Sequence, residues 1–124
     1  MSRAAIAAAL LVAAAALGPS AAQAQATAQE VAASCRELLK PNPSKSFDVG
    51  LCVGSFSTLH TLSAMVDQHH APLLGFCRPP GADYRELARV FVRHVETHPQ
   101  SAQVYYVIEA VNALADAYPC TAKK

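Results

Sequence analysis

The sequence predicts an all-α fold: a small bundle of about four helices stapled by disulfide bonds. Three observations lead to this prediction. Apolar side chains recur at steps of three and four residues in four separate segments, as on the buried face of a helix. No segment alternates apolar and polar residues for long enough to form a convincing strand. Four cysteines stand in a chain of 124 residues that begins with the pattern of an export signal.

The N-terminal segment 1–24 predicts a cleaved secretory signal peptide. Arg3 provides a short basic start, Ala4–Leu17 is apolar without a charge, and an Ala-Gln-Ala sequence precedes the expected cleavage point after Ala24. The apolar run is shorter than the roughly 20 residues that a membrane span needs, so we favour a signal peptide over an uncleaved anchor. Residues 25–124 would then form one small helical domain.

The charge of this domain is expected to be close to zero. The whole chain carries a formal net charge of +1 with neutral histidines, and Arg3 is the only charged residue of segment 1–24. A charge balance near zero is not the electrostatic footprint of a nucleic-acid-binding domain, which carries an excess of basic residues. We therefore expect no nucleic-acid partner and, after cleavage, no membrane span.

The first two helices are expected at 28–40 and from residue 47 or 48 onward, where Asp48 can cap the helix. Pro41 ends the first helix, and Lys40–Ser46 is a loop. Two glycines, Gly50 and Gly54, lie one turn apart on the second helix; they indicate either close approach of another backbone or simple tolerance. The inner stripe of the second helix is predicted to consist of Cys52, Phe56, Leu59, Leu62, Met65 and Val66.

The third and fourth helices follow a long connection at Gln68–Ala82, which partly packs inward. Asp83-Tyr-Arg-Glu86 is a capping box that opens the third helix. The fourth helix is predicted to begin at Pro99 and to end before Pro119, next to Cys120. The predicted inner positions are Leu87, Val90, Phe91 and Val95 on the third helix, and Val104, Val107, Ile108, Val111, Leu114, Ala115 and Tyr118 on the fourth.

The cysteines predict two structural disulfides. No two of them are separated by only two residues, which excludes a thioredoxin-like motif, a c-type haem attachment site and the common zinc ribbons. In an up-and-down bundle, Cys35 and Cys52 lie near one end, and Cys77 and Cys120 lie near the other. This arrangement predicts the pairs Cys35–Cys52 and Cys77–Cys120, although four cysteines allow three pairings and the sequence does not choose among them.

The side chains do not predict an enzyme, a metal site or a cofactor. His94 and His98 have a spacing that can chelate a metal, but Glu96 is misplaced for the His-Glu-x-x-His motif, so we favour surface or capping histidines. No Gly-x-Ser-x-Gly nucleophile motif is present. The arginines at every fourth position of the third helix, Arg85, Arg89 and Arg93, favour a solvated face over a binding surface for an acidic partner. We also favour solvated positions for the remaining histidines, His60, His69 and His70.

Four short segments around the cysteines form a recognisable set: Cys52-Val-Gly54, Phe76-Cys77-Arg-Pro79, His98-Pro99 and Ala117-Tyr-Pro-Cys120. Taken together, they resemble the Rap/Tai immunity proteins, which are small exported helical proteins associated with type VI secretion. The resemblance runs from about Cys35 to Cys120. Two residues depart from it, since Ser55 and Thr58 stand where the family usually has an aromatic residue and a glycine.

The resemblance implies a periplasmic protein that binds an incoming peptidoglycan amidase effector and blocks its active site. A polar, proline-rich loop would enter the amidase cleft, either Arg78–Ala82 or Lys40–Ser46. In the first case the binding residues are expected to be Arg78, Pro79, Pro80 and Gly81. The sequence leaves a homodimer open, and two other functions as well: an envelope stress-related binding protein or chaperone, and a histidine-based metal carrier.

Overall fold

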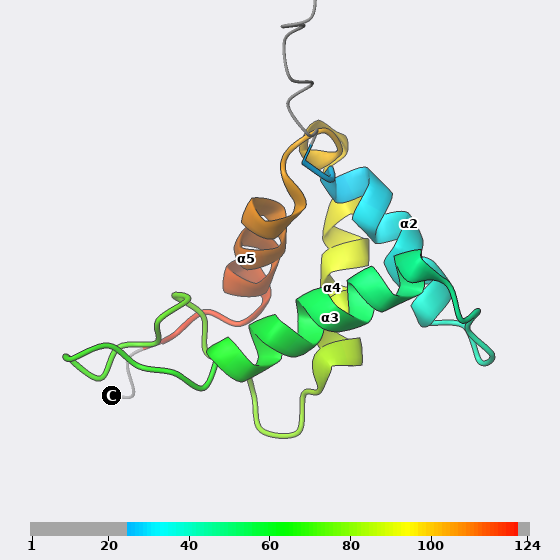
Figure 1. Cartoon of the computed structure of the whole chain (residues 1–124). Coiled ribbons are helices and arrows are strands. Elements are labelled where there is room, and N and C mark those ends of the chain that lie inside the picture. The colour runs from blue at the N-terminus through cyan, green and yellow to red at the C-terminus, as the bar shows by residue number, and fades with distance from the viewer. Residues whose placement is uncertain (1–24, 122–124) are drawn as a thin grey trace, which may run out of the picture.

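The computed structural model describes residues 25–121 and forms four α-helices and one short 3-10 helix within them (Figure 1). No strand forms in this part of the chain, which contains two isolated β-bridges. The all-α prediction is therefore confirmed, whereas the predicted signal peptide, residues 1–24, lies outside the described residues. The elements are α2 (Ala28–Leu38), α3 (Phe47–Leu62), α4 (Tyr84–Thr97), η1 (Pro99–Ser101) and α5 (Tyr106–Ala117).

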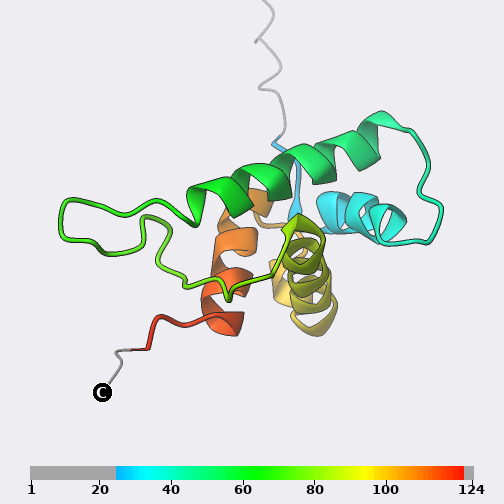
Figure 2. The same ribbon diagram turned by 90° about the horizontal axis from the view of Figure 1, so that it is seen from below.

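Helix α3 lies across one side of the other three helices (Figures 1 and 2). α4 packs against α2, α3 and α5, so it occupies the middle of the bundle. Phe56 of α3 and Phe91 of α4 meet in the core with their ring centroids 5.2 Å apart. Burial of such apolar side chains provides most of the free energy that stabilises a domain of this size. None of the helices in residues 25–121 is long and apolar enough to span a membrane.

Side-chain caps fix where the first three helices begin. Thr27 and Glu30 form a capping box at α2, in which Thr27 N donates to Glu30 Oε2 at 2.8 Å. Ser46, rather than the predicted Asp48, caps α3 by accepting from Val49 N at 3.2 Å. Asp83 caps α4 as predicted, since its carboxylate accepts from Glu86 N at 3.0 Å.

The predicted start of the last helix at Pro99 is wrong. Pro99 begins the short helix η1, and α5 begins only at Tyr106. The chain between them supplies hydrogen-bond acceptors to the first turn of α2: Val104 O accepts from Ala28 N at 2.8 Å, and Ala102 O accepts from Gln29 N at 3.0 Å. The first N–H groups of any helix lack partners within that helix. This segment satisfies two of those of α2 and lies outside α5.

The predicted apolar stripe of the last helix is also partly wrong. Ile108 is 54% exposed, whereas Ala110, Ala113 and Leu114 are buried. Small alanine side chains allow α5 to lie close to α4, and this turns the larger aliphatic residues outward. Of the seven positions predicted to face inward on the last helix, Leu114 is buried. Apart from the exposed Ile108, the other predicted positions are half-buried: Val104, Val107, Val111, Ala115 and Tyr118.

Two further boundaries differ from the prediction. α2 ends at Leu38 instead of Lys40, and α3 ends at Leu62. Met65 and Val66, which were predicted on the inner stripe of α3, therefore lie in the following loop and are 48% and 54% exposed. The backbone explains the second difference, because Met65 O accepts from Leu73 N at 2.9 Å and so turns the chain back. On α4, Val90 is half-buried, while the predicted core residues Leu87, Phe91 and Val95 are buried.

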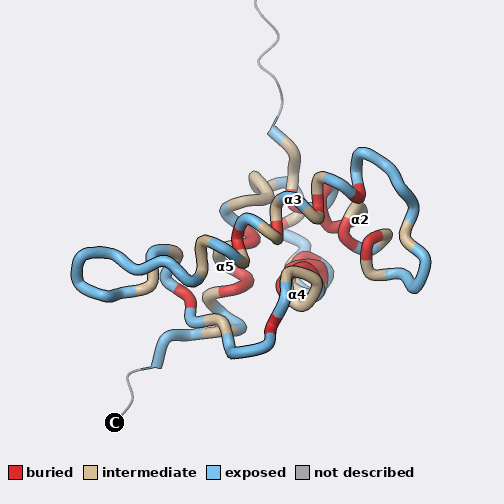
Figure 3. The backbone as a smooth tube through the Cα atoms, turned by 60° about the horizontal axis from the view of Figure 1, so that its bottom comes forward, coloured by how far each residue is buried: buried red, intermediate tan, exposed pale blue. Residues whose placement is uncertain are grey.

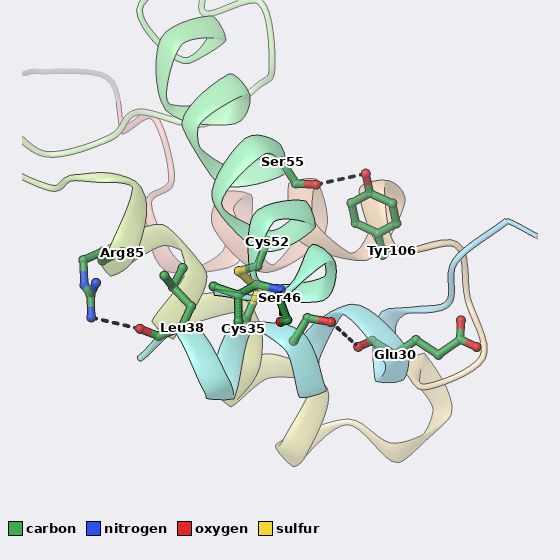
Figure 4. Close-up of a disulfide and its surroundings, with 10 residues drawn as sticks. Glu30, Cys35, Leu38, Ser46, Cys52, Ser55, Arg85 and Tyr106 are labelled. Atoms are coloured by element: carbon green, nitrogen blue, oxygen red, sulfur yellow. Dashed lines mark hydrogen bonds between the residues drawn. A yellow bond between two sulfur atoms is a disulfide. The ribbon is translucent and has the colours of Figure 1, made fainter. Parts of the chain in front are cut away.

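Both predicted disulfides are confirmed. Cys35–Cys52 joins α2 to α3 with a Cα–Cα distance of 5.3 Å, and Cys77–Cys120 joins the chain before α4 to the chain after α5 with a distance of 4.9 Å. The first bond lies inside the bundle, surrounded by helices (Figure 4). The second joins two exposed residues, and the loop that follows α3 is itself largely exposed (Figure 3).

Candidate functional site

The α3–α4 loop, residues 63–83, extends away from the helices and carries the residues predicted to bind a partner (Figures 1 and 2). Turns within the loop are hydrogen-bonded. Asp67 Oδ1 accepts from His69 N at 2.7 Å and from Ala71 N at 3.0 Å. Phe76 is fully buried and anchors the loop in the core. The loop is therefore an ordered protrusion with an apolar anchor.

Arg78 has a structural role in this loop. Its Nε donates to Ser63 Oγ at 3.0 Å, and its Nη1 donates to Ala82 O at 2.8 Å. The guanidinium thus ties the start of the loop to its end. Pro79, Pro80 and Gly81 are exposed beside it, and Gly81 has φ +86°, a conformation that glycine adopts without strain. The predicted loop therefore offers a short exposed segment whose shape is set by prolines, a glycine and Arg78.

A polar depression of about 620 Å³ lies at the base of this segment, between the start of α4 and Tyr118. Its charges are mostly paired: Arg89 forms an ion pair with Glu86, and Arg85 donates to Leu38 O at 3.0 Å (Figure 4). Burial raises the pKa of Tyr118 above its ordinary value. The predicted solvated arginine face is thus only partly correct, because Arg85 is half-buried and helps to join α4 to α2.

The second loop proposed from the sequence, residues 40–46, joins α2 to α3 and is mostly exposed. Glu37 holds its base: its carboxylate pairs with Lys40 and accepts from Ser44 N at 3.3 Å. These contacts, the Lys40 hydrogen bond foremost, lower the pKa of Glu37. Both proline-rich loops are therefore accessible: the loop at 40–46 joins α2 to α3 at the right of Figure 1, and Arg78–Ala82 lies just before the start of α4.

Sequence reasoning missed an apolar groove of about 570 Å³ along α3. A Cβ added to Gly50 or Gly54 would meet nothing within 4 Å, so no backbone approaches them closely and, of the two alternatives drawn from the sequence, simple tolerance is the correct one. The glycines leave space on the helix surface beside Phe47, which is 85% exposed. Ser55 Oγ donates to Tyr106 Oη at 3.1 Å at the wall of the groove (Figure 4). The lining residues are Phe47, Gly50, Leu51, Gly54, Ser55, Thr58, Leu59, Leu62, Tyr106 and Val107.

The histidine pair of α4 is part of a polar network inside the bundle. His94 Nε2 lies 3.1 Å from Glu109 Oε2, and each side chain is only 11% exposed. The pKa of Glu109 lies below its ordinary value because Ser101 and then His94 and Asn112 hydrogen-bond to its carboxylate, although burial acts in the opposite direction. His98 stacks on His94 at a centroid distance of 4.2 Å. The interpretation of His94 as a surface residue was wrong, because it joins α4 to α5.

Among residues 25–121, no three histidine, cysteine, aspartate or glutamate side chains gather as ligands of one metal ion would. His69 and His70 lie in the exposed α3–α4 loop, as expected for solvated histidines. In residues 25–121, the candidate surfaces for contact with a partner include the two polar loops and the apolar groove.

A family model of Rap1a immunity proteins matches residues 27–120, from the cap of α2 to the last cysteine. The chain belongs to the Rap1a immunity protein family. The match covers all four helices and both disulfides of the structure, and it confirms the resemblance drawn from the cysteine-bearing segments. Comparisons with curated proteins and with solved structures give no match. Membership of the Rap1a family implies that the partner is a protein, a secreted effector against which the chain confers immunity.

Proposed function

We propose that this protein is a periplasmic immunity protein that binds a peptidoglycan amidase effector of type VI secretion and blocks its active site. The observation that carries the proposal is the Rap1a match across the whole helical domain. An N-terminal segment with the pattern of a signal peptide supports a periplasmic location. In this function the protein acts by occupying a cleft, and it needs neither catalytic residues nor a cofactor.

The exposed segment Arg78–Gly81 suits such a cleft. Two consecutive prolines fix φ at Pro79 and Pro80, and the two hydrogen bonds of Arg78 hold the segment at its base. A loop that is ordered before binding loses less conformational entropy on binding than a flexible loop. We therefore assign the contact with the catalytic cleft to this segment, and a supporting contact to the groove beside Phe47, since a large exposed aromatic side chain is a common anchor in interfaces.

The test uses the mature chain and any amidase effector that is encoded next to its gene. Calorimetry measures binding, and release of peptide from cell-wall material measures inhibition. Replacing Pro79 and Pro80 by glycine (Pro79→Gly with Pro80→Gly) should weaken binding at least ~10-fold, or about 1.4 kcal/mol, because the loop must then be ordered on binding.

The matched control is Pro41→Gly with Pro43→Gly, which makes the same change in the loop at 40–46. Unchanged binding by this control is expected. Loss of binding in the control, with full binding by the Pro79 and Pro80 variant, would transfer the contact to the loop at 40–46. If the unaltered protein neither binds the amidase nor protects cells that carry the amidase in their periplasm, the proposed function is wrong.

The apolar groove of α3 favours one other function, that of an envelope stress-related binding protein or chaperone. Such a protein would expose more apolar surface under acid conditions and bind unfolded chains there. Circular dichroism and binding of a hydrophobic dye at neutral and acidic pH separate the two functions. A chaperone should bind more dye at low pH, whereas an immunity protein should keep its helicity and bind no additional dye.

A further inference from the structure

We propose that the Cys77–Cys120 disulfide is a redox-sensitive clip: a dithiol reductant opens it while Cys35–Cys52 stays closed, and its opening loosens the segment Arg78–Gly81. The effect on partner binding rests on the proposed function above. The selective opening rests on the surroundings of the two disulfides alone.

The two disulfides differ in their access to solvent. Cys35 and Cys52 are fully buried between α2 and α3. Cys77 and Cys120 are both exposed. Thiol–disulfide exchange requires an incoming thiolate to reach one sulfur atom, so access controls its rate. A reductant can reach the outer bond in the folded protein, but it can reach the inner bond only after α2 and α3 separate.

The clip holds a short tail against the α3–α4 loop. Beyond the end of α5 at Ala117, Cys77 N donates to Tyr118 O at 2.8 Å, and the next residues, 119–121, are exposed. This backbone hydrogen bond and the disulfide link the tail to the loop. Tyr118 itself is half-buried and packs against the core. Opening the disulfide therefore frees residues 119–121, while Tyr118 keeps its hydrogen bond to Cys77 and the helices keep their contacts.

The loop keeps two anchors of its own after the clip opens. Phe76 is fully buried next to Cys77, and Arg78 on the other side donates to Ser63 and Ala82. The loop is thus expected to become more mobile without leaving the bundle. Because Arg78–Gly81 follows Cys77 directly, this increase in mobility acts on the segment that we assign to the effector cleft.

The reaction is an ordinary exchange with a dithiol. One thiolate of the reductant attacks a sulfur of the Cys77–Cys120 bond, forms a mixed disulfide and releases the other cysteine as a thiolate. The second thiol of the reductant then displaces the remaining cysteine and closes the reductant's own disulfide. In sum, the protein gains two electrons and two protons as two thiols, and the dithiol becomes a disulfide.

The first experiment measures the opening itself. The folded mature protein is treated with increasing dithiothreitol, quenched with iodoacetamide and mapped by mass spectrometry, while circular dichroism follows helicity. Cys77 and Cys120 should be labelled at least ~10-fold faster than Cys35 and Cys52, with helicity unchanged, because only the outer bond is accessible. Equal labelling of all four cysteines, or loss of helicity in step with labelling of the outer pair, overturns the proposal.

A matched variant tests whether burial alone protects the inner disulfide from reduction. In Cys77→Ser with Cys120→Ser, the inner bond should resist the same dithiothreitol concentration in the folded protein and should be reduced quickly in urea. Rapid reduction of the inner bond without urea would show that burial does not protect it, which also overturns the proposal.

The second experiment tests regulation. The same double variant serves as the open form, and its affinity for the neighbouring amidase should be at least ~3-fold weaker than that of the oxidised protein, since ordering a mobile loop costs binding free energy. If the double variant and the oxidised protein bind the amidase with equal affinity, the regulatory role is wrong. The labelling experiment alone then decides whether the outer disulfide is reduced selectively. If the oxidised protein binds no amidase, the proposed function and the regulatory role both fail, whereas the labelling experiment still decides whether the clip opens selectively.

Discussion

The two disulfides join the same small bundle, yet one lies in its core and the other at its periphery. Cys35–Cys52 connects two helices through fully buried sulfur-bearing residues, and Cys77–Cys120 connects an exposed loop to an exposed tail. Their sequence separations are 17 and 43 residues. The entropy of the unfolded chain alone would give about 3 kcal/mol to the inner bond and about 4 kcal/mol to the outer bond. Packing in the native state predicts that the inner bond stabilises the fold more than the outer bond, which is the opposite order. Measuring the loss of stability for each pair therefore shows whether unfolded-state entropy or native-state packing dominates.

The largest effect is expected from Cys35→Ala with Cys52→Ala. This change should lower the free energy of unfolding by about 4 to 5 kcal/mol, of which about 3 come from the lost cross-link and about 1 to 2 from the space left by two buried sulfur atoms. Urea unfolding followed by circular dichroism measures the loss. A loss smaller than that of the outer pair would contradict the importance of packing.

The next effect concerns the anchor of the peripheral region. Phe76→Ala removes the fully buried side chain of the α3–α4 loop and should cost about 3 to 4 kcal/mol through the cavity that it leaves. Leu73→Ala is the control in the same loop, because Leu73 is 53% exposed and its loss should change stability by about 0.5 kcal/mol or less. Equal losses would mean that Phe76 does not anchor the loop.

A smaller loss, about 2 to 3 kcal/mol, is expected for Cys77→Ser with Cys120→Ser. The value falls below the chain-entropy figure of about 4 kcal/mol because the released tail gains freedom in the folded protein as well as in the unfolded chain. The same urea experiment ranks both pairs directly. If the outer pair costs more than the inner pair, unfolded-state entropy dominates and the role given to burial is wrong.

The next prediction concerns Glu109, whose contact with His94 joins α4 to α5 away from both disulfides. Its pKa is lower in the folded protein than its ordinary value, so the carboxylate stabilises the fold above the unfolded-state pKa of about 4.3, and this contribution is lost as pH falls through the lower folded-state pKa. Glu109→Gln should cost about 1 to 2 kcal/mol at pH 7, and the difference should shrink below about pH 4.

Thermal unfolding of both proteins between pH 3 and pH 7, read at steps of roughly half a pH unit, measures this dependence. Glu96→Gln is the control: Glu96 forms an exposed ion pair with Arg36 at 2.8 Å, and its loss should cost about 0 to 1 kcal/mol. If the difference in stability between the Glu109 variant and the unaltered protein is the same at every pH, the charge of Glu109 does not stabilise the contact between α4 and α5.

The smallest effect is a gain. Gly54→Ala should raise stability by up to about 1 kcal/mol, because the added methyl group meets open space and alanine favours the helix. Gly81→Ala, at φ +86° in the peripheral loop, should instead lower stability by about 1 kcal/mol. Thermal unfolding compares the two variants. A loss in Gly54→Ala would reveal a close contact at the groove that the isolated chain does not show.

The accuracy of the sequence predictions followed the range of the interactions. The cap at Asp83, the core side of α4 and the two disulfide pairs depend on local patterns or on simple bundle geometry, and all were correct except that Val90 of α4 is half-buried. The last helix was not, because its start depends on backbone contacts between residues 102–106 and the chain around the start of α2, far apart in sequence. No sequence pattern within residues 97–120 indicates that the backbone N–H groups at the start of α2 take their acceptors from this segment.

The candidate binding surfaces show the same division. The proline-rich loops were visible in the sequence, because prolines and glycines mark exposed connections whatever they pack against. The groove at Gly50 and Gly54 was not, because the same glycines fit either a close contact or an open surface. The role of Arg78 was also hidden, since its partners Ser63 and Ala82 come together only in the folded loop.

The sequence by itself determined the helical class and the family of this protein. These follow from the periodicity of apolar residues, from caps and from motifs, which act within a few turns of chain. The tertiary structure decided where the last helix begins, which face of that helix is buried and which disulfide is exposed. Those features depend on burial and on hydrogen bonds between distant segments, and such contacts are fixed only when the four helices pack together.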